Sequence, residues 1–159
     1  SLTPPAGVQF ISVETAQEMR AAVLAEFADS DIVIKAAAVA DYRVSCQSSQ
    51  KIKKTNEPLL LVLEKNPDIL AELGRIKTQQ ILVGFAAETE NLIAHAAEKL
   101  QRKNADLIVA NDVTQRGAGF NADTNIVKLL YKNGKVEELP QMAKKKLADV
   151  IFDKIRNLR

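Results

Sequence analysis

The chain has 159 residues, the size of one ordinary domain, and a chain of this length buries roughly two-thirds of its unfolded surface. Hydrophobic residues make up 47% and charged residues 26%, and 22 Lys and Arg against 20 Asp and Glu give a formal net charge of +2. This composition excludes disordered and fibrous proteins, and so small a surplus argues against non-specific nucleic-acid binding. No apolar run approaches the roughly 20 residues that span a bilayer, so no membrane-spanning segment is expected.

The start of the chain and its one cysteine bear on its origin. Residues 1–7 are short, polar and proline-bearing, unlike a signal peptide. Because the chain lacks an initiator Met and opens in a linker-like segment, we expect it to be a piece of a longer protein. Cys46 cannot form an internal disulfide. It suits a reducing cytoplasm and is interpreted as an incidental free thiol.

Short β-branched runs alternate with helical patterns along the chain. Residues 8–11 form a first apolar run, and Thr15 to Glu18 then make a capping box worth on the order of 1 kcal/mol. Apolar residues follow at helical spacing, and Asp29 to Asp31 are expected to end this helix. Residues 32–38 form a continuous apolar strand that only Lys35 interrupts.

The same alternation continues through the middle of the chain. Residues 59–63 are apolar, and Asn-Pro-Asp at 66–68 then predicts the N-cap, N1 and N2 positions of a short helix. A strand at 80–85, a helix at 89–103 with one apolar stripe, and a strand at 106–110 follow. Strands that are apolar throughout, alternating with amphipathic helices, indicate a parallel sheet covered on both faces.

The last part of the chain predicts an antiparallel edge. Runs at 125–131 and 136–139 flank Asn133-Gly134, a strong hairpin signal, and Pro140 is expected to open a final helix. The whole chain is therefore predicted to be a single Rossmann-like three-layer α/β domain, whose mostly parallel sheet ends in an antiparallel C-terminal hairpin.

Ligands of an open parallel sheet bind beyond the carboxyl ends of its strands. Three segments follow such strands: residues 38–42, 84–89 and 111–113. If the three strands are parallel, these segments line one edge of the sheet, and that edge is the predicted binding site.

Two groups of lysines would equip this edge for an anion. Lys-Ile-Lys-Lys at 51–54 lies in a loop that begins at residue 44 and is expected to be mobile, and Lys99 and Lys103 lie one turn apart on a helix. Repulsion between such a pair costs only a few tenths of a kcal/mol. An ammonium about 4 Å from a phosphate charge gains roughly 4 kcal/mol at an effective dielectric of about 20. The sequence thus permits a triphosphate site without a Walker loop.

Each of these features also has a purely structural interpretation. Lysines on a helix usually form a solvated face, and residues 51–54 fit a solubilising loop equally well. Phe85 fits the core, Asp41 fits a cap on the next turn, and helix capping alone accounts for residues 66–68. Composition and spacing therefore indicate no more than a nucleotide-binding α/β domain.

Two other features carry less weight. His95 is expected at the surface, and one histidine supports neither a metal cluster nor a Ser-His dyad. Residues 117–121 are only loosely similar to the dinucleotide fingerprint, because the third glycine is missing from its place.

Seven sequence blocks carry a family resemblance. They are AAVADY at 37–42, KIKK at 51–54, KNPDI at 65–69, VGFAAET at 83–89, KNAD at 103–106, NDV at 111–113 and GFNADTN at 119–125. In this order and with these gaps they closely resemble phosphopantothenate–cysteine ligase, the phosphopantothenoylcysteine synthetase of coenzyme A biosynthesis. In many bacteria that ligase is the C-terminal half of a bifunctional flavoprotein whose N-terminal half is a decarboxylase, and FMN would belong only to that half.

The resemblance implies a cytoplasmic, homodimeric, Rossmann-like enzyme that uses Mg-CTP. The carboxylate of 4′-phosphopantothenate would attack the α-phosphorus, forming an acyl-cytidylate and releasing pyrophosphate. The amine of L-cysteine would then attack the acyl carbon and expel CMP. The enzyme would thus be an acid–amino-acid ligase that forms a C–N bond.

The resemblance also implies roles for single residues, although it leaves the metal ligands and the role of Asn121 open. Lys51 would contact CTP and assist formation of the acyl-cytidylate. Asp41 would hold part of the nucleotide, and Ala37 and Ala38 would approach it with backbone atoms. The remaining implied CTP contacts are Asn66, Pro67, Asp68 and Ile69 against the base or ribose, Phe85 against the nucleotide, and Lys99 and Lys103 on the triphosphate.

The resemblance departs from the family at the start of the chain. Family members begin with a strand and a glycine-rich loop that carry Arg-x-x-x-Asn and Asn-His-Ser-Ser-Gly-like motifs for phosphopantothenate and the acyl-cytidylate. Residues 1–159 do not contain these motifs. We therefore expect this piece alone to be impaired or inactive as a ligase and to keep weak nucleotide affinity.

Two alternatives remain open. One is a non-catalytic nucleotide-binding or dimerisation fragment. The other is a pyridine-nucleotide oxidoreductase domain, which is disfavoured because no glycine fingerprint follows a strand.

Overall fold

The computed structural model describes residues 3–46, 48–54, 58–115 and 122–158. The chain forms two compact units. The first unit comprises Ser1–Glu26 and Ala38–Asp68, and the second comprises Phe27–Ala37 and Ile69–Arg159. Residues 117–121, which were compared with the dinucleotide fingerprint, lie outside the described residues. None of the described helices combines the length and the apolar character needed to cross a membrane.

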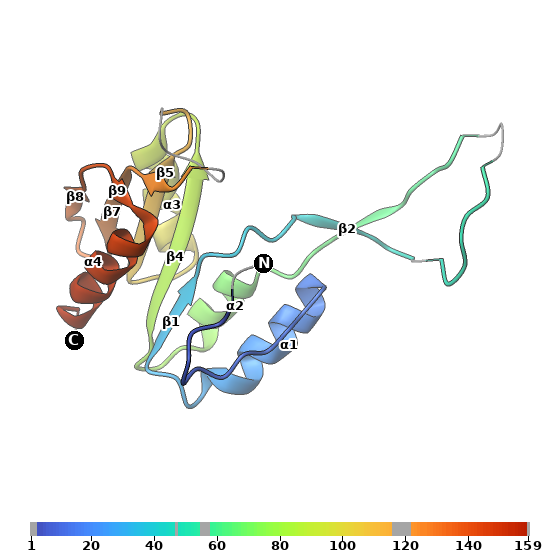
Figure 1. Cartoon of the computed structure of the whole chain (residues 1–159), viewed down its shortest axis with the longest axis horizontal. Coiled ribbons are helices and arrows are strands. Elements are labelled where there is room, and N and C mark those ends of the chain that lie inside the picture. The colour runs from blue at the N-terminus through green and yellow to red at the C-terminus, as the bar shows by residue number, and fades with distance from the viewer. Residues whose placement is uncertain (1–2, 47, 55–57, 116–121, 159) are drawn as a thin grey trace. The chain divides into compact units, whose positions relative to one another are not determined.

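The second unit contains a five-stranded sheet in the order β1-β4-β5-β7-β8 (Figure 1). The strands β1 (Ile32–Lys35), β4 (Ile81–Glu88) and β5 (Leu107–Asp112) are parallel. The strands β7 (Val127–Tyr131) and β8 (Val136–Glu138) are antiparallel to their neighbours. The prediction of a mostly parallel sheet with an antiparallel C-terminal hairpin is confirmed.

Helices cover both faces of this sheet. On one face, α3 (Leu92–Arg102) packs on the alternate strand residues Ile108 and Ala110, and α2 (Ile69–Ile76) comes close above Gly84. On the other face, α4 (Lys144–Arg156) packs on Leu107, Val109 and their neighbours. All four of these β5 residues are fully buried. This double-sided burial explains why β5 reads as a continuous apolar run, and it confirms the predicted three layers.

The predicted hairpin turn forms between β7 and β8. Gly134 has a φ of +85°, which an L side chain rarely adopts, and its N–H donates to the Tyr131 carbonyl at 2.9 Å. The Asn133 side chain accepts from the Lys135 N–H at 3.0 Å. Asn133 and Gly134 therefore both stabilise the hairpin turn that the Asn-Gly sequence predicts.

The final helix begins later than predicted. Pro140 does not open it, because Met142–Ala143 pair as a short strand, β9, with β6 (Thr124–Asn125). The Lys144 N–H then donates to the Asp123 carbonyl at 3.0 Å, and α4 starts at Lys144. A pairing partner distant in sequence overrides the local signal.

One predicted strand is shorter than expected, and the first apolar run is not a strand. Only Ile32–Lys35 of the predicted 32–38 strand pairs with β4, and the register ends at Lys35 opposite Gly84. Residues 8–11 have no strand partner in the described part of the chain, and Val8 and Phe10 are exposed.

The first unit contains α1 (Ala16–Phe27), whose last residue belongs to the second unit, and the antiparallel pair β2 (Tyr42–Val44) and β3 (Leu63–Lys65). The predicted capping box is present at the start of α1. The Glu18 N–H donates to Thr15 Oγ1 at 3.1 Å, and the Thr15 N–H donates to Glu18 Oε2 at 3.1 Å. Two orphan donors are thus satisfied reciprocally.

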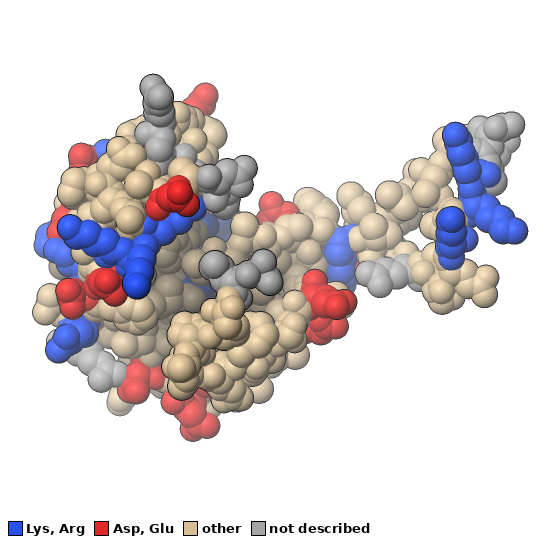
Figure 2. Space-filling view, viewed as in Figure 1, with Lys and Arg blue, Asp and Glu red and all other residues tan. Residues whose placement is uncertain are grey.

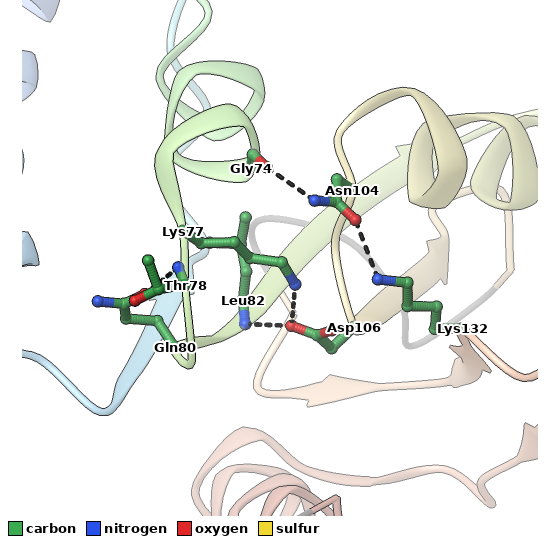
Figure 3. Close-up of polar contacts among 8 residues, drawn as sticks. All are labelled: Gly74, Lys77, Thr78, Gln80, Leu82, Asn104, Asp106 and Lys132. Carbon is green, nitrogen blue, oxygen red and sulfur yellow. Dashed lines mark hydrogen bonds and ion pairs between the residues drawn. The ribbon is translucent and has the colours of Figure 1, made fainter.

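A partly buried ion pair secures the amino ends of the central strands (Figure 3). Asp106 Oδ2 accepts from Lys77 Nζ at 2.6 Å and from the Leu82 N–H at 2.8 Å. The side chain of Lys77 is 9% exposed and that of Asp106 is 22% exposed. The pair therefore links the end of α2 to β4 and β5 in a poorly solvated position.

We predict that Asp106→Asn lowers the free energy of unfolding by about 2–3 kcal/mol, because it leaves the Lys77 ammonium buried without a carboxylate. Urea-induced unfolding measures this loss. The double variant Lys77→Met/Asp106→Leu should lose less than the sum of the two single losses, since the partners act as a pair. A loss below about 0.5 kcal/mol for Asp106→Asn would contradict this role.

A second polar cluster joins the hairpin to α4. Glu137 accepts from Lys154 Nζ and from Tyr131 Oη, the latter at 3.2 Å, and Lys135 Nζ lies 3.4 Å away. The hydrogen bond from Lys154 is the main reason that the pKa of Glu137 lies below its usual range. Burial is the main cause that raises the pKa of Tyr131 to about 12.

We predict that Glu137→Gln lowers the Tm near pH 7 and that this difference shrinks below about pH 4. A carboxyl with a depressed folded-state pKa contributes fully above its unfolded-state pKa and loses that contribution as the pH falls through its folded-state pKa. Thermal unfolding at several pH values measures the difference. In a Lys154→Met background, the Tm difference caused by Glu137→Gln should be smaller at every pH. A Tm difference that does not depend on pH would refute the contribution of the ionised Glu137 carboxylate.

Candidate functional site

The carboxyl ends of β4 and β5 lie side by side in the second unit. Ala87 pairs with Asn111, and Glu88 pairs with Asp112. The predicted segments 84–89 and 111–113 therefore share one edge of the sheet. Residues 38–42 belong to the first unit, and their convergence on the same edge stays a prediction.

Asp112 organises the turn that leaves β5. Its carboxylate accepts from Thr114 Oγ1 at 2.6 Å, from the Thr114 N–H at 3.1 Å and from Gln115 Nε2 at 2.9 Å. These bonds, led by the Thr114 hydroxyl, hold the pKa of Asp112 below its usual range. The side chain is thus a carboxylate at neutral pH, with its oxygens already engaged.

Asn111 lies at the predicted edge, and the sequence assigned it no role of its own. Its Nδ2 donates to Asn125 Oδ1 at 3.4 Å, and its Oδ1 is buried and has no hydrogen-bond partner among the described residues. An unsatisfied buried acceptor costs about 1–3 kcal/mol. The only sequence signal for Asn111 was its place in block 111–113.

Lys99 reaches from α3 to β4. Its Nζ donates to the Phe85 carbonyl at 2.7 Å, and the residue is half-buried. The Phe85 side chain packs with the core cluster on the α4 side of the sheet. This agrees with the interpretation of Phe85 as a core residue. Contact between Phe85 and a nucleotide stays a prediction.

Lys103 follows α3 directly and is buried, with only 7% of the residue exposed. Its N–H donates to the Lys99 carbonyl at 3.0 Å. A solvated helix face therefore does not describe these two lysines. Their grip on a triphosphate stays a prediction.

In the first unit, the structure brings Asp41 and Asn66 together. The Asn66 N–H donates to the Asp41 carbonyl at 2.8 Å, and Asn66 Nδ2 donates to the Ala40 carbonyl at 2.9 Å. Arg43 lies beside them and pairs with Glu64 at 2.9 Å. Two of the residues implied for CTP thus meet through their backbones.

This arrangement corrects the predicted start of α2. Asn66 is not the N-cap, because its side chain is directed to Ala40 and α2 begins at Ile69. The side chain of Ile69 lies in the core, with 2% of the residue exposed. Residues 66–68 form the approach to the helix.

The remaining predicted residues are exposed. Lys51, Lys53 and Lys54 lie at the surface of the first unit, and Figure 2 shows basic side chains gathered in the segment between β2 and β3. Ala37 and Ala38 are also exposed. Convergence of Lys51 with Lys99 and Lys103 stays a prediction.

Other groups that could do chemistry are peripheral or undescribed. Cys46 is an exposed free thiol and His95 is exposed, as predicted. Asn121 lies outside the described residues. Within the part of the chain that the structure describes, no three His, Cys, Asp or Glu side chains are grouped to hold a metal ion.

Comparisons with known proteins connect this geometry to a family. The family model described as "DNA/pantothenate metabolism flavoprotein C-terminal domain" matches residues 1–158. The coenzyme A biosynthesis bifunctional protein CoaBC of Bacillus subtilis (strain 168) is 50% identical over 159 residues, which are 99% of this chain and 38% of that protein. The CoaBC protein of Escherichia coli (strain K12) is 43% identical over 159 residues, 98% of this chain and 39% of that protein.

Solved structures agree. The crystal structure of the C-terminal domain of a CoaBC protein matches with a TM-score of 0.80 and 41% identity, covering 98% of this chain and 68% of that one. A flavoprotein structure from Streptococcus pneumoniae has the same TM-score at 24% identity, covering 99% of this chain and 76% of that one, and supports the fold alone. The chain spans less than two-fifths of the length of the Bacillus relative. It belongs to the DNA/pantothenate metabolism flavoprotein C-terminal domain family, which confirms the resemblance carried by the seven blocks.

Proposed function

We propose that this chain is the ligase domain that joins 4′-phosphopantothenate to L-cysteine in coenzyme A biosynthesis, with Mg-CTP as the activating substrate. The observation that carries the proposal is 50% identity, over 99% of the chain, to a protein named for coenzyme A biosynthesis. The seven blocks in register support the same reaction. The Mg²⁺ would arrive with the triphosphate as part of the substrate.

The reaction has two steps, and its nucleophiles belong to the substrates. A carboxylate oxygen of phosphopantothenate attacks the α-phosphorus of CTP, and the bond to the β-phosphate oxygen breaks to release pyrophosphate. The cysteine amine then attacks the acyl carbon and loses a proton as CMP leaves. The protein therefore has to position groups and neutralise charge, without a catalytic thiol or imidazole of its own. The exposure of Cys46 and His95 fits that division of work.

Lys99 and Lys103 would supply the positive charge for the triphosphate. A cation held in a poorly solvated position attracts a phosphate more strongly than one in water, because the effective dielectric is lower. The burial of Lys103 and the contact of Lys99 with the Phe85 carbonyl support this role. Lys51 would assist the first step. Asp41 and Asn66, which also belong to the first unit, would hold the nucleotide.

We predict that Lys99→Ala and Lys103→Ala each weaken CTP binding by about tenfold, or about 1.4 kcal/mol. Titration calorimetry on the full-length protein measures the Kd for CTP. Lys→Met at each position removes the charge but keeps an apolar stem, so it separates the loss of charge from the loss of packing. Lys146→Ala, an exposed lysine on α4, is the matched control and should bind CTP as the parent does. Unchanged CTP affinity in both alanine variants would show that Lys99 and Lys103 have only a structural role.

A nucleotide series separates the proposal from its alternatives. Thermal unfolding is followed with CTP, ATP, NADP and CMP in the presence of Mg²⁺. Stabilisation that is largest with CTP supports the ligase. Stabilisation by NADP without CTP would indicate the oxidoreductase, and no response to any nucleotide would indicate a non-catalytic module.

A homodimer is part of the proposal, and the first unit offers a surface for it. Residues 59–63 are five consecutive apolar residues, each between 54% and 88% exposed. Adjacent residues of an extended chain point to opposite faces, so both faces of this segment are uncovered. The neighbouring pair β2–β3 has only two strands, too few to be stable alone in water. A second copy of the same segment would cover it.

We predict that Leu60→Lys converts the dimer to a monomer, because it places a charge in the apolar strip at a residue that is 88% exposed. Sedimentation velocity on the full-length protein measures the change. Phe152→Lys on α4, at a residue that is 53% exposed, is the control and should leave the dimer intact. A Leu60→Lys protein that sediments as the parent would contradict this surface.

A further inference from the structure

The C-terminal end of α3 has a defined cap. Asn104 adopts a left-handed backbone with a φ of 48°. Its N–H donates to the Gln101 carbonyl at 3.0 Å, and the Ala105 N–H donates to the Leu100 carbonyl at 3.0 Å. This is the Schellman arrangement, in which the left-handed position is filled by glycine or, less often, by asparagine. The helix therefore ends at a fixed point, with Lys103 as its C-cap.

The Asn104 side chain ties this end to two other elements (Figure 3). Its Nδ2 donates to the Gly74 carbonyl in the last turns of α2 at 2.8 Å. Its Oδ1 accepts from Lys132 Nζ, at the β7–β8 turn, at 3.0 Å. Glycine at this position would keep the cap but would make neither bond, so the structure uses the asparagine amide for more than capping.

Gly74 allows α2 and the end of α3 to touch. A Cβ at this position would lie 1.8 Å from the Lys103 carbonyl oxygen, which is far inside van der Waals contact. Any other residue would force the backbone at Lys103 away from α2. This contact between α2 and the end of α3 thus falls on the backbone of a residue that we assign to the triphosphate.

We infer that Asn104 and Gly74 are positioning residues for the triphosphate-binding lysines, an inference that rests on the proposed function. Lys99 lies in the last turn of α3 and Lys103 at its end, so the placement of this end decides where both side chains start. The Lys103 stem is buried and has lost the freedom to correct a displaced backbone. The α2–α3 clamp, formed by Gly74, Asn104 and Lys132, therefore sets where the ammonium groups meet the phosphates.

The test is Asn104→Gly in the full-length protein, because glycine keeps the left-handed cap and removes only the side-chain bonds. Titration calorimetry measures the Kd for Mg-CTP and for CMP. We expect the Kd for CTP to rise at least about fivefold. The Kd for CMP should change by less than about twofold, since CMP lacks the β- and γ-phosphates that the lysines would hold. In steady-state assays the KM for CTP should rise more than kcat falls.

A double variant makes the inference sharper. In a Lys103→Ala background, Asn104→Gly should add almost nothing to the loss of CTP affinity, because the displaced group is already gone. Equal weakening of CTP and CMP, or losses that multiply in the double variant, would overturn the positioning role. Glu137→Gln weakens bonds to Lys154 and Tyr131 and removes none of the three clamp residues; it is the control for general destabilisation and should leave the CTP-to-CMP ratio unchanged.

Two further results keep the outcomes distinct. If Asn104→Gly does not fold, Asn104→Asp carries the test, since aspartate tolerates the left-handed backbone and accepts from Lys132 but cannot donate to Gly74. The same selective loss of CTP affinity is expected. If Lys103→Ala leaves CTP binding unchanged, the proposed function of the lysine fails; if Lys103→Ala weakens binding and both Asn104 variants do not, the clamp alone is refuted.

Discussion

The burial of β5 on both faces is the constraint on which the second unit depends. Leu107 and Val109 face α4, and Ile108 and Ala110 face α3. A strand enclosed in this way can present polar groups only at its ends. Asp106 at the amino end pairs with Lys77 and secures the scaffold, while Asn111 and Asp112 at the carboxyl end lie where an open sheet binds its ligand. The proposed chemistry would thus lie at the end of β5 opposite to the ion pair.

The chemistry proposed for this family member needs charge in the right place more than a reactive side chain. Both nucleophiles come from the substrates, so the useful property of the protein is rigidity around its cations. Lys99 donates to a β4 carbonyl, and Lys103 is buried, with its backbone carbonyl close to Gly74 of α2. This explains why a chain with one histidine and one exposed cysteine is compatible with a ligase.

Much of the fold could be predicted from sequence because its signals are local. The apolar runs of β4 and β5 predicted buried parallel strands, Asn133-Gly134 predicted the hairpin, and Thr15 with Glu18 predicted the helix cap. The start of α4 could not be predicted, because β9 pairs with a strand that lies far away in sequence. The burial of Lys103 could not be predicted either, because lysine is usually exposed and the contact of its backbone with Gly74 joins segments that are distant in sequence. The site residues that the sequence did suggest came from a family resemblance, since spacing alone left the lysines on a solvated face.

The most direct test of the account follows the first half-reaction in the full-length protein. CTP, Mg²⁺ and 4′-phosphopantothenate are mixed without cysteine, and phosphorus NMR follows the products. We expect pyrophosphate together with an acyl-cytidylate signal, both dependent on phosphopantothenate, and CMP only after cysteine is added. Pyrophosphate release that does not require phosphopantothenate, or CTP that stays intact until cysteine is present, would contradict it.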